Sequence, residues 1–261
     1  GGTSGVITLS TGKSTGGKGG SITLSVGEGN TGVGGDVTVN AGITSASDNI
    51  GGAITIASGK GTATSSGAVS ISTSDGGTAG VSGNIGLTTG DTADGNTGTI
   101  AFTSGKSTGG KGGSITLSVG EGDTGVGGDV TVNAGKTSAS NSAGGIVTIQ
   151  SGASTQGKSG KITLNTLDGG VSGDIEMETG ATTGGTSGVI TLSTGKSTGG
   201  KGGSITLSVG EGDTGIGGHL ILRAGNTIAD SGTTGGNIVV KSGESALTSS
   251  GALTMATPNA G

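Results

Sequence analysis

Few side chains in this sequence are of the kinds that carry out catalysis. The 261 residues include one histidine, His219, and no cysteine, so there is no thiol nucleophile and little scope for imidazole chemistry. The carboxylates of Glu176 and Glu178 lie two residues apart, which places them on one face of an extended segment. No acid–base partner of a different kind is visible for this pair of carboxylates. We therefore expect no enzymatic activity.

Two kinds of ligand site were weighed against the glycine-rich segments. Gly34-Gly35-Asp36-Val37 and Gly127-Gly128-Asp129-Val130 come nearest to the calcium-binding nonapeptide, which needs a recurrent aspartate. Aspartate follows the glycine in too few repeats to form a ladder of calcium ligands. A phosphate loop needs the pattern GxxxxGK[ST] between a strand and a helix, and the sequence lacks it. We expect no metal and no cofactor.

Threonine hydroxyls form the one regular array of polar groups. They recur along the chain at Thr8, Thr23, Thr38, Thr55, Thr116, Thr131, Thr148, Thr163, Thr191 and Thr206. Threonine also suits the solvated face of a β-strand, which is the structural explanation of the same array. The threonine column is therefore a candidate surface-binding array. Whether it can bind a surface depends on the secondary structure that positions the threonines.

The threonines belong to a phrase, Gly-polar-aliphatic-Thr-aliphatic-polar-small-Gly, that occurs seventeen times; residues 20–27 are a clean copy. Its first residue, which we call the anchor glycine, stands at positions 5, 20, 35, 52, 67, 83, 98, 113, 128, 145, 160, 173, 188, 203, 218, 236 and 251. Eleven of the spacings are 15 residues. A fixed period of this size is typical of a solenoid, whose repeats bury their apolar faces by stacking.

The columns of the phrase predict how each coil is built. Positions +2 and +4 after the anchor are apolar in every copy, and this alternation predicts a short β-strand with both side chains facing inward. Position +6 is small and shares that face. Glycine at the anchor and at +7 (replaced by Ser74, Leu167 and Pro258) predicts the corners, through positive φ or close backbone approach. The abundant Gly, Ser and Thr also suit disorder, but two unbroken apolar columns favour order.

We therefore predict an all-β parallel β-solenoid, or β-helix, of about 17 coils that forms a single domain over residues 1–261. Residues 105–135 nearly repeat residues 12–42, and residues 184–217 nearly repeat residues 1–34. These duplications predict six-coil superrepeats near 12–104, 105–194 and 195–261, the last one partial. They also suggest a segment of a longer repeat protein, with Pro258 as the one sign of an end.

Position +8 carries charges that alternate from one coil to the next. Because stacked coils lie about 4.8 Å apart, neighbouring side chains in this column would touch. The predicted inter-coil charge pairs are Lys13–Glu28, Lys60–Asp75, Lys106–Glu121–Lys136 and Lys196–Glu211. Exposed pairs contribute under about 1 kcal/mol each, so we expect them to maintain register rather than to bind a ligand.

Charge and hydropathy exclude two classes of partner. The chain has 12 Lys and Arg against 17 Asp and Glu, with Phe102 as its one aromatic residue, so nucleic-acid binding has neither a basic patch nor stacking platforms. No apolar run approaches the roughly 18 residues of a membrane span.

The Gly/Ser/Thr-rich composition and the phrase Gly19-Gly20-Ser21-Ile22-Thr23-Leu24 resemble the β-solenoid repeat proteins of extracellular and cell-surface fibres. That resemblance implies an extracellular structural protein, a segment of a filament or stalk whose partners are copies of itself. The threonine column resembles, more weakly, that of insect ice-binding β-solenoids. It implies ice, or a mineral or polysaccharide surface, as the alternative partner. The second threonine rank of those proteins is here serine in six copies and threonine only at Thr88 and Thr103.

Overall fold

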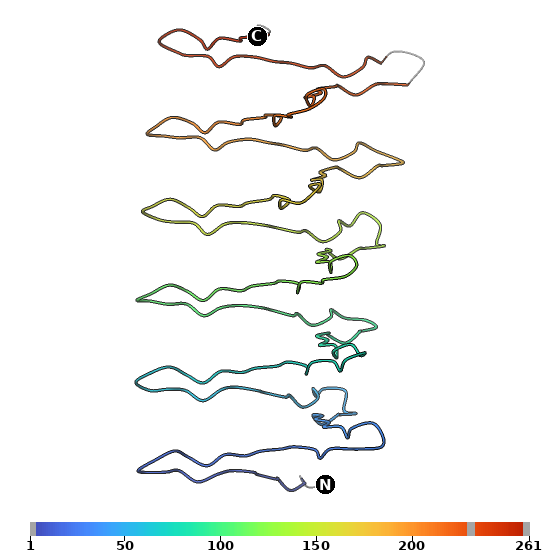
Figure 1. The fold of residues 1–261 in the computed structure, drawn as a ribbon, viewed down its shortest axis with the longest axis vertical. Helices are drawn as coiled ribbons and strands as arrows, with labels where there is room; N and C mark the ends of the chain where they lie inside the picture. Colours follow the sequence, from blue (N-terminus) through green and yellow to red (C-terminus); the bar gives the residue numbers. More distant parts are fainter. Residues whose placement is uncertain (1–3, 229–232, 258–261) are drawn as a thin grey trace. The chain divides into compact units, whose positions relative to one another are not determined.

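The computed structural model describes residues 4–228 and 233–257, and within them it contains no helix and no β-strand. The chain runs as extended segments joined by turns (Figure 1). The phrases occupy the extended segments. Pro258, the predicted end signal, lies outside the described residues, as does the last part of the third superrepeat.

The predicted all-β parallel solenoid is therefore wrong. Alternation of apolar and polar residues says which side chains share a face, but a β-strand also needs backbone partners along its length. In the described part of the chain, the backbone hydrogen bonds between phrases join only their ends, as in Gly52 N–H to Gly42 O at 2.8 Å. Within the phrases, apolar and polar residues alternate as in a strand, but the backbone forms no sheet.

The apolar columns are not buried either. Among the described residues, no side chain is buried, and the +2 and +4 positions predicted to face inward are open to solvent, with Ile22 57% and Leu24 78% exposed. The chain exposes 25826 Å². A folded monomer of its 23.7 kDa exposes about 9,800 Å² and the unfolded chain about 34,000 Å². A single copy thus leaves most of its apolar surface in water.

The corners predicted at the anchor and +7 glycines are not where the described chain bends: its bends and turns lie inside the linkers. Every described linker contains a bend or turn, and none interrupts a phrase. They lie at 15–17, 30–32, 47–48, 62–64, 78–79, 93–95, 108–110, 123–125, 139–141, 155–157, 170–171, 183–185, 198–200, 213–216 and 246–248. Glycine- and serine-rich sequence is placed where the backbone must turn.

The chain separates into two compact units, Gly1–Val132 and Asn133–Gly261. The boundary falls inside the phrase 128–135, so neither unit ends with a superrepeat. Each unit is built from the same alternation of extended phrase and bent linker. The prediction of a single domain over residues 1–261 stays a prediction.

Candidate functional site

The end of each phrase meets the start of the next, and we call this contact a neck. A Cβ at every anchor glycine from Gly20 to Gly251 would lie 2.7–3.7 Å from the +6 side chain of the preceding phrase. Real Cβ atoms essentially never come within 3.0 Å of such neighbours, so at several necks a larger residue would force a neighbouring group to shift. Close backbone approach, one of the two predicted reasons for the anchor glycine, is thus the one that applies.

The hydrogen bonds at the necks differ with the residue at +6, although not every Thr or Ser at +6 forms one. Where it is alanine, as at Ala41, Ala134 and Ala224, the next anchor N–H donates to the preceding +7 carbonyl oxygen at 2.8–2.9 Å. The same bond forms after Ser58, Ser151 and Ser242. Three threonines donate through the hydroxyl instead: Thr11 to Gly20 O at 3.2 Å, Thr179 to Gly188 O at 3.4 Å and Thr194 to Gly203 O at 3.3 Å.

Valine at +6 makes the third kind of neck. The Cγ1 atoms of Val26, Val119 and Val209 would each lie 2.7 Å from a Cβ on the following anchor glycine. The branched side chain fills the space between the two segments, and no neck hydrogen bond forms at these three described positions. The sequence places these residues on the inward face of a strand, whereas the structure uses them to fix the spacing of successive phrases.

Position +9 contributes to several of the bends, and the sequence-based prediction missed it. Each linker carries Ser or Thr there, or glycine: hydroxyls at 14, 44, 92, 107, 137, 154, 182, 197, 227 and 245, and glycine at 29, 61, 76, 122, 169 and 212. The Ser154 hydroxyl accepts from Gly157 N–H at 2.8 Å, and the Ser245 hydroxyl accepts from Thr248 N–H at 3.1 Å. Such hydroxyl-capped turns are a known use of Ser and Thr.

Glycine at +9 permits close approach at some of the other bends, whereas a Cβ at Gly122 would meet nothing within 4 Å. A Cβ at Gly61 would collide with the Ser65 carbonyl oxygen, and one at Gly76 would lie 2.9 Å from the Gly80 carbonyl oxygen. The regular choice between a hydroxyl and glycine at one linker position was the signal available in the sequence. The linkers therefore have a positional code of their own, although their lengths vary.

The predicted threonine column is exposed along its whole length. This holds for Thr8, Thr23, Thr38, Thr55, Thr116, Thr131, Thr148, Thr163, Thr191 and Thr206. Because the phrases that carry them form no strand in the described residues, no sheet holds these hydroxyls in a flat array. Their role as a surface-binding array stays a prediction.

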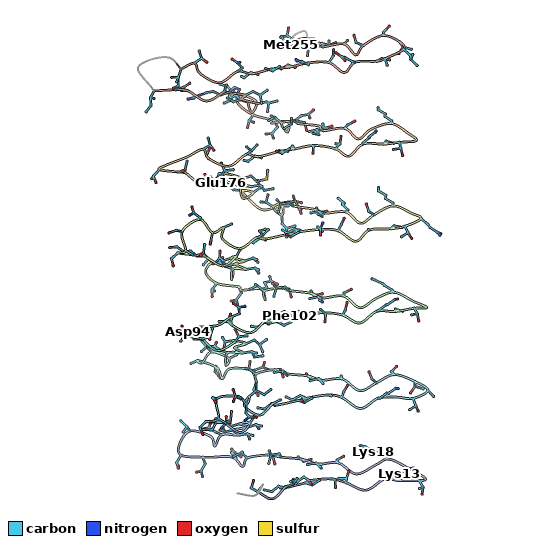
Figure 2. All side chains as sticks on the ribbon, turned by 180° about the vertical axis from the view of Figure 1, so that it is seen from behind. Lys13, Lys18, Asp94, Phe102, Glu176 and Met255 are labelled. Atoms are coloured by element: carbon cyan, nitrogen blue, oxygen red, sulfur yellow. The ribbon has the colours of Figure 1, made fainter. Side chains whose placement is uncertain are left out.

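The charged residues of the +8 column are exposed and lie just before the bends. Lys13 and Lys18 flank the turn of the linker 12–20 (Figure 2). In residues 4–228 and 233–257 the structure brings none of the predicted partners within ion-pair distance. The inter-coil pairing stays a prediction, because it requires phrases to stack in a way that the necks do not impose.

The groups with possible chemistry do not converge. His219, Glu176 and Glu178 are each exposed on extended segments, and Figure 2 shows Glu176 in such a segment. The described part of the chain contains no pocket and no cluster of three residues able to hold a metal ion. None of its residues forms a helix that could cross a bilayer. Nothing positive points to enzymatic activity.

The features that remain are exposed apolar columns, held in a regular sequence of phrases by the necks and bends. Searches against protein-family models, curated proteins and solved structures each found no match.

Proposed function

We propose that this chain is a structural protein that associates with copies of itself, as a segment of an extracellular or cell-surface filament or stalk. The observation that carries the proposal is the exposure of the apolar columns. Leu24 and Leu117 are each 78% exposed and Leu207 is 65% exposed, at one position of three nearly identical phrases. Globular proteins bury most of their large apolar side chains, whereas none is buried in the described residues of this chain.

The surface area supports the same proposal quantitatively. The chain exposes 25826 Å², about 16,000 Å² more than a folded monomer of its mass. Stable protein interfaces bury about 1,200–2,000 Å² in total, so one copy offers surface for several neighbours. At about 25 cal/mol per Å² of apolar area, covering even part of the columns favours association.

The repetition of the same apolar positions in every phrase favours a second copy of the chain as the partner. Every phrase presents the same two apolar positions, so a copy that fits one phrase fits the next ones as well. Association between identical repeats propagates rather than closes when the contact is heterologous, and the product is a filament.

The test compares two triple variants of the full chain. One replaces the column leucines (Leu24→Ser, Leu117→Ser, Leu207→Ser), and the control replaces apolar residues of the linkers that are even more exposed (Val33→Ser, Val126→Ser, Ile216→Ser). Light scattering and electron microscopy over a concentration series measure assembly. We expect filaments from the wild type and the control and loss of assembly from the column variant. Monodisperse wild-type chains at high concentration would contradict the proposal.

A further inference from the structure

One eight-residue sequence occurs three times without change. Residues 20–27, 113–120 and 203–210 all read Gly-Ser-Ile-Thr-Leu-Ser-Val-Gly, and we call their inner residues, 21–26, 114–119 and 204–209, the repeated segments. Serine and threonine alternate strictly with isoleucine, leucine and valine, so on extended backbone the polar and apolar side chains lie on opposite faces. Of the seventeen phrases, only these three carry valine at +6, so only they have three large apolar side chains on one face.

These apolar faces are open to solvent. In the first repeated segment Ile22 is 57%, Leu24 is 78% and Val26 is 51% exposed. The corresponding residues of the other two segments are 47–78% exposed. Each of these side chains thus keeps about half or more of its surface in water, although the valine also fills a neck.

The backbone of the repeated segments is unpaired as well. None of their N–H and C=O groups, all of which the structure describes, hydrogen-bonds to another part of the chain. The phrase 52–59, by contrast, is held at both ends, through Gly52 N–H and Gly59 O. Extended backbone with free donors and acceptors can take up a further strand, as the edge of a sheet does.

A second copy of the same segment fits both the backbone and the apolar face. An extended partner can satisfy the N–H and C=O groups in a ladder, and an identical sequence brings the same alternation, so the apolar side chains of both lie on one side of the pair. The repeated segments carry no charge, so two copies never place like charges opposite each other. In a parallel pair of the phrase 35–42, Asp36 would face Asp36. Short uncharged segments of high β-propensity without proline are those that stack in this way.

We propose that copies of this chain associate by backbone pairing, in which each repeated segment adds as a β-strand to the same segment of a neighbouring copy. The described residues of a single chain form no strand, so these strands exist only between copies. The inference rests on the proposed self-association and adds where and how the copies meet. Each pairing involves one segment of each copy, and three segments let one chain hold more than one neighbour.

Proline separates the contribution of the backbone from that of the apolar side chains. Thr23→Pro, Thr116→Pro and Thr206→Pro, combined in the full chain, remove one N–H from each repeated segment and leave every apolar side chain in place. These N–H groups have no partner within the chain, so a single copy keeps its own contacts. Light scattering over a concentration series measures the concentration at which filaments form. Because each proline removes a hydrogen bond between copies, we expect this concentration to rise at least several-fold.

Two matched triple variants are the controls. Alanine at the same three positions removes the same hydroxyl groups but keeps the N–H groups. Thr38→Pro, Thr131→Pro and Thr163→Pro introduce as many prolines at the same +3 position of three phrases that each carry a charged residue at +1. We expect both controls to assemble as the wild type does. Assembly of the first variant at the wild-type concentration, or an equal loss in the two proline variants, would overturn the proposal.

Fibre diffraction distinguishes this inference from the proposed function on which it rests. We expect assembled wild-type chains to give a reflection at about 4.7–4.8 Å, the spacing of neighbouring strands. Filaments without that reflection would overturn the backbone pairing and leave the self-association standing. Wild-type chains that stay monomeric at high concentration would overturn both.

Discussion

The neck at Gly145 gives the sharpest test of how successive phrases are held. Gly145 N–H donates to Gly135 O at 2.8 Å, and a Cβ at residue 145 would lie 2.9 Å from the Gly135 backbone nitrogen. That nitrogen cannot move without moving the chain. An exposed hydrogen bond contributes about 0.5–1.5 kcal/mol, whereas overpacking of this kind costs about 1–3 kcal/mol. In Gly145→Ala the free-energy cost of the steric overlap exceeds the stabilisation from the hydrogen bond, so the contact between the two phrases should open.

Gly251→Ala is the matched control. Its amide donates to Gly243 O at 2.9 Å, but a Cβ there meets nothing nearer than 3.6 Å, which is ordinary van der Waals contact. Amide hydrogen exchange measures the protection of the backbone N–H at each of the two necks separately. A bond of about 0.5–1.5 kcal/mol slows exchange by roughly 2- to 12-fold. We expect this protection to vanish at residue 145 in Gly145→Ala and to persist at residue 251 in Gly251→Ala. Unchanged protection at residue 145, or equal losses in the two variants, would refute the steric reasoning.

Three further predictions follow from the necks, bends and columns. Gly35→Ala places a Cβ 2.7 Å from Val26 Cγ1 and should weaken the nuclear Overhauser contacts across that neck. Adding Val26→Ala to the same chain should restore these contacts. Gly34→Ala is the control and should have no effect, because a Cβ at residue 34 meets open space. Ser154→Ala removes the 2.8 Å acceptor of Gly157 N–H and should raise the exchange rate of that amide roughly 2- to 12-fold, with Ser154→Thr close to wild type. The purified chain should show no thermal hysteresis, because its threonines are not held in a sheet; measurable hysteresis that is lost in Thr23→Ala and Thr116→Ala would contradict this.

The sequence specified the local units of this molecule better than their assembly. The period and the phrase boundaries were predictable because they depend on residue types close together in the chain, whereas the bends lie inside the linkers rather than at the predicted glycine corners. The role of Gly35 and its equivalents as points of close approach was one of two predicted explanations. Position +9, which Ser154 occupies, was overlooked. Ser, Thr and Gly are common throughout the linkers, so their regular occurrence at this one position stands out only once the geometry of the bends is known.

The strands failed for a different physical reason. The alternation at Ile22 and Leu24 predicts that both side chains share a face, and these residues do lie on extended backbone. The sequence of a phrase does not determine which other segment its backbone groups hydrogen-bond with. The partner depends on how many residues the linker uses to return and on the +6 residue. At the Val26 neck the next phrase forms no backbone bond, and at the alanine necks the single backbone bond is not followed by others, so no strand forms in the described residues.

The necks have a consequence for how the chain can change in length. Each one closes a loop of 7 to 12 residues, from Thr166–Gly173 to Ala224–Gly236, so the contacts that define a repeat are local in sequence. Loop-closure entropy rises by only about 0.6 kcal/mol when a loop doubles, which explains why insertions in the linkers are tolerated. Contact order stays low however many repeats are joined, and repeats should form independently rather than in one cooperative transition. Whole superrepeats can therefore be gained or lost by duplication without refolding the remainder, so the length of the chain can be selected separately from its local structure.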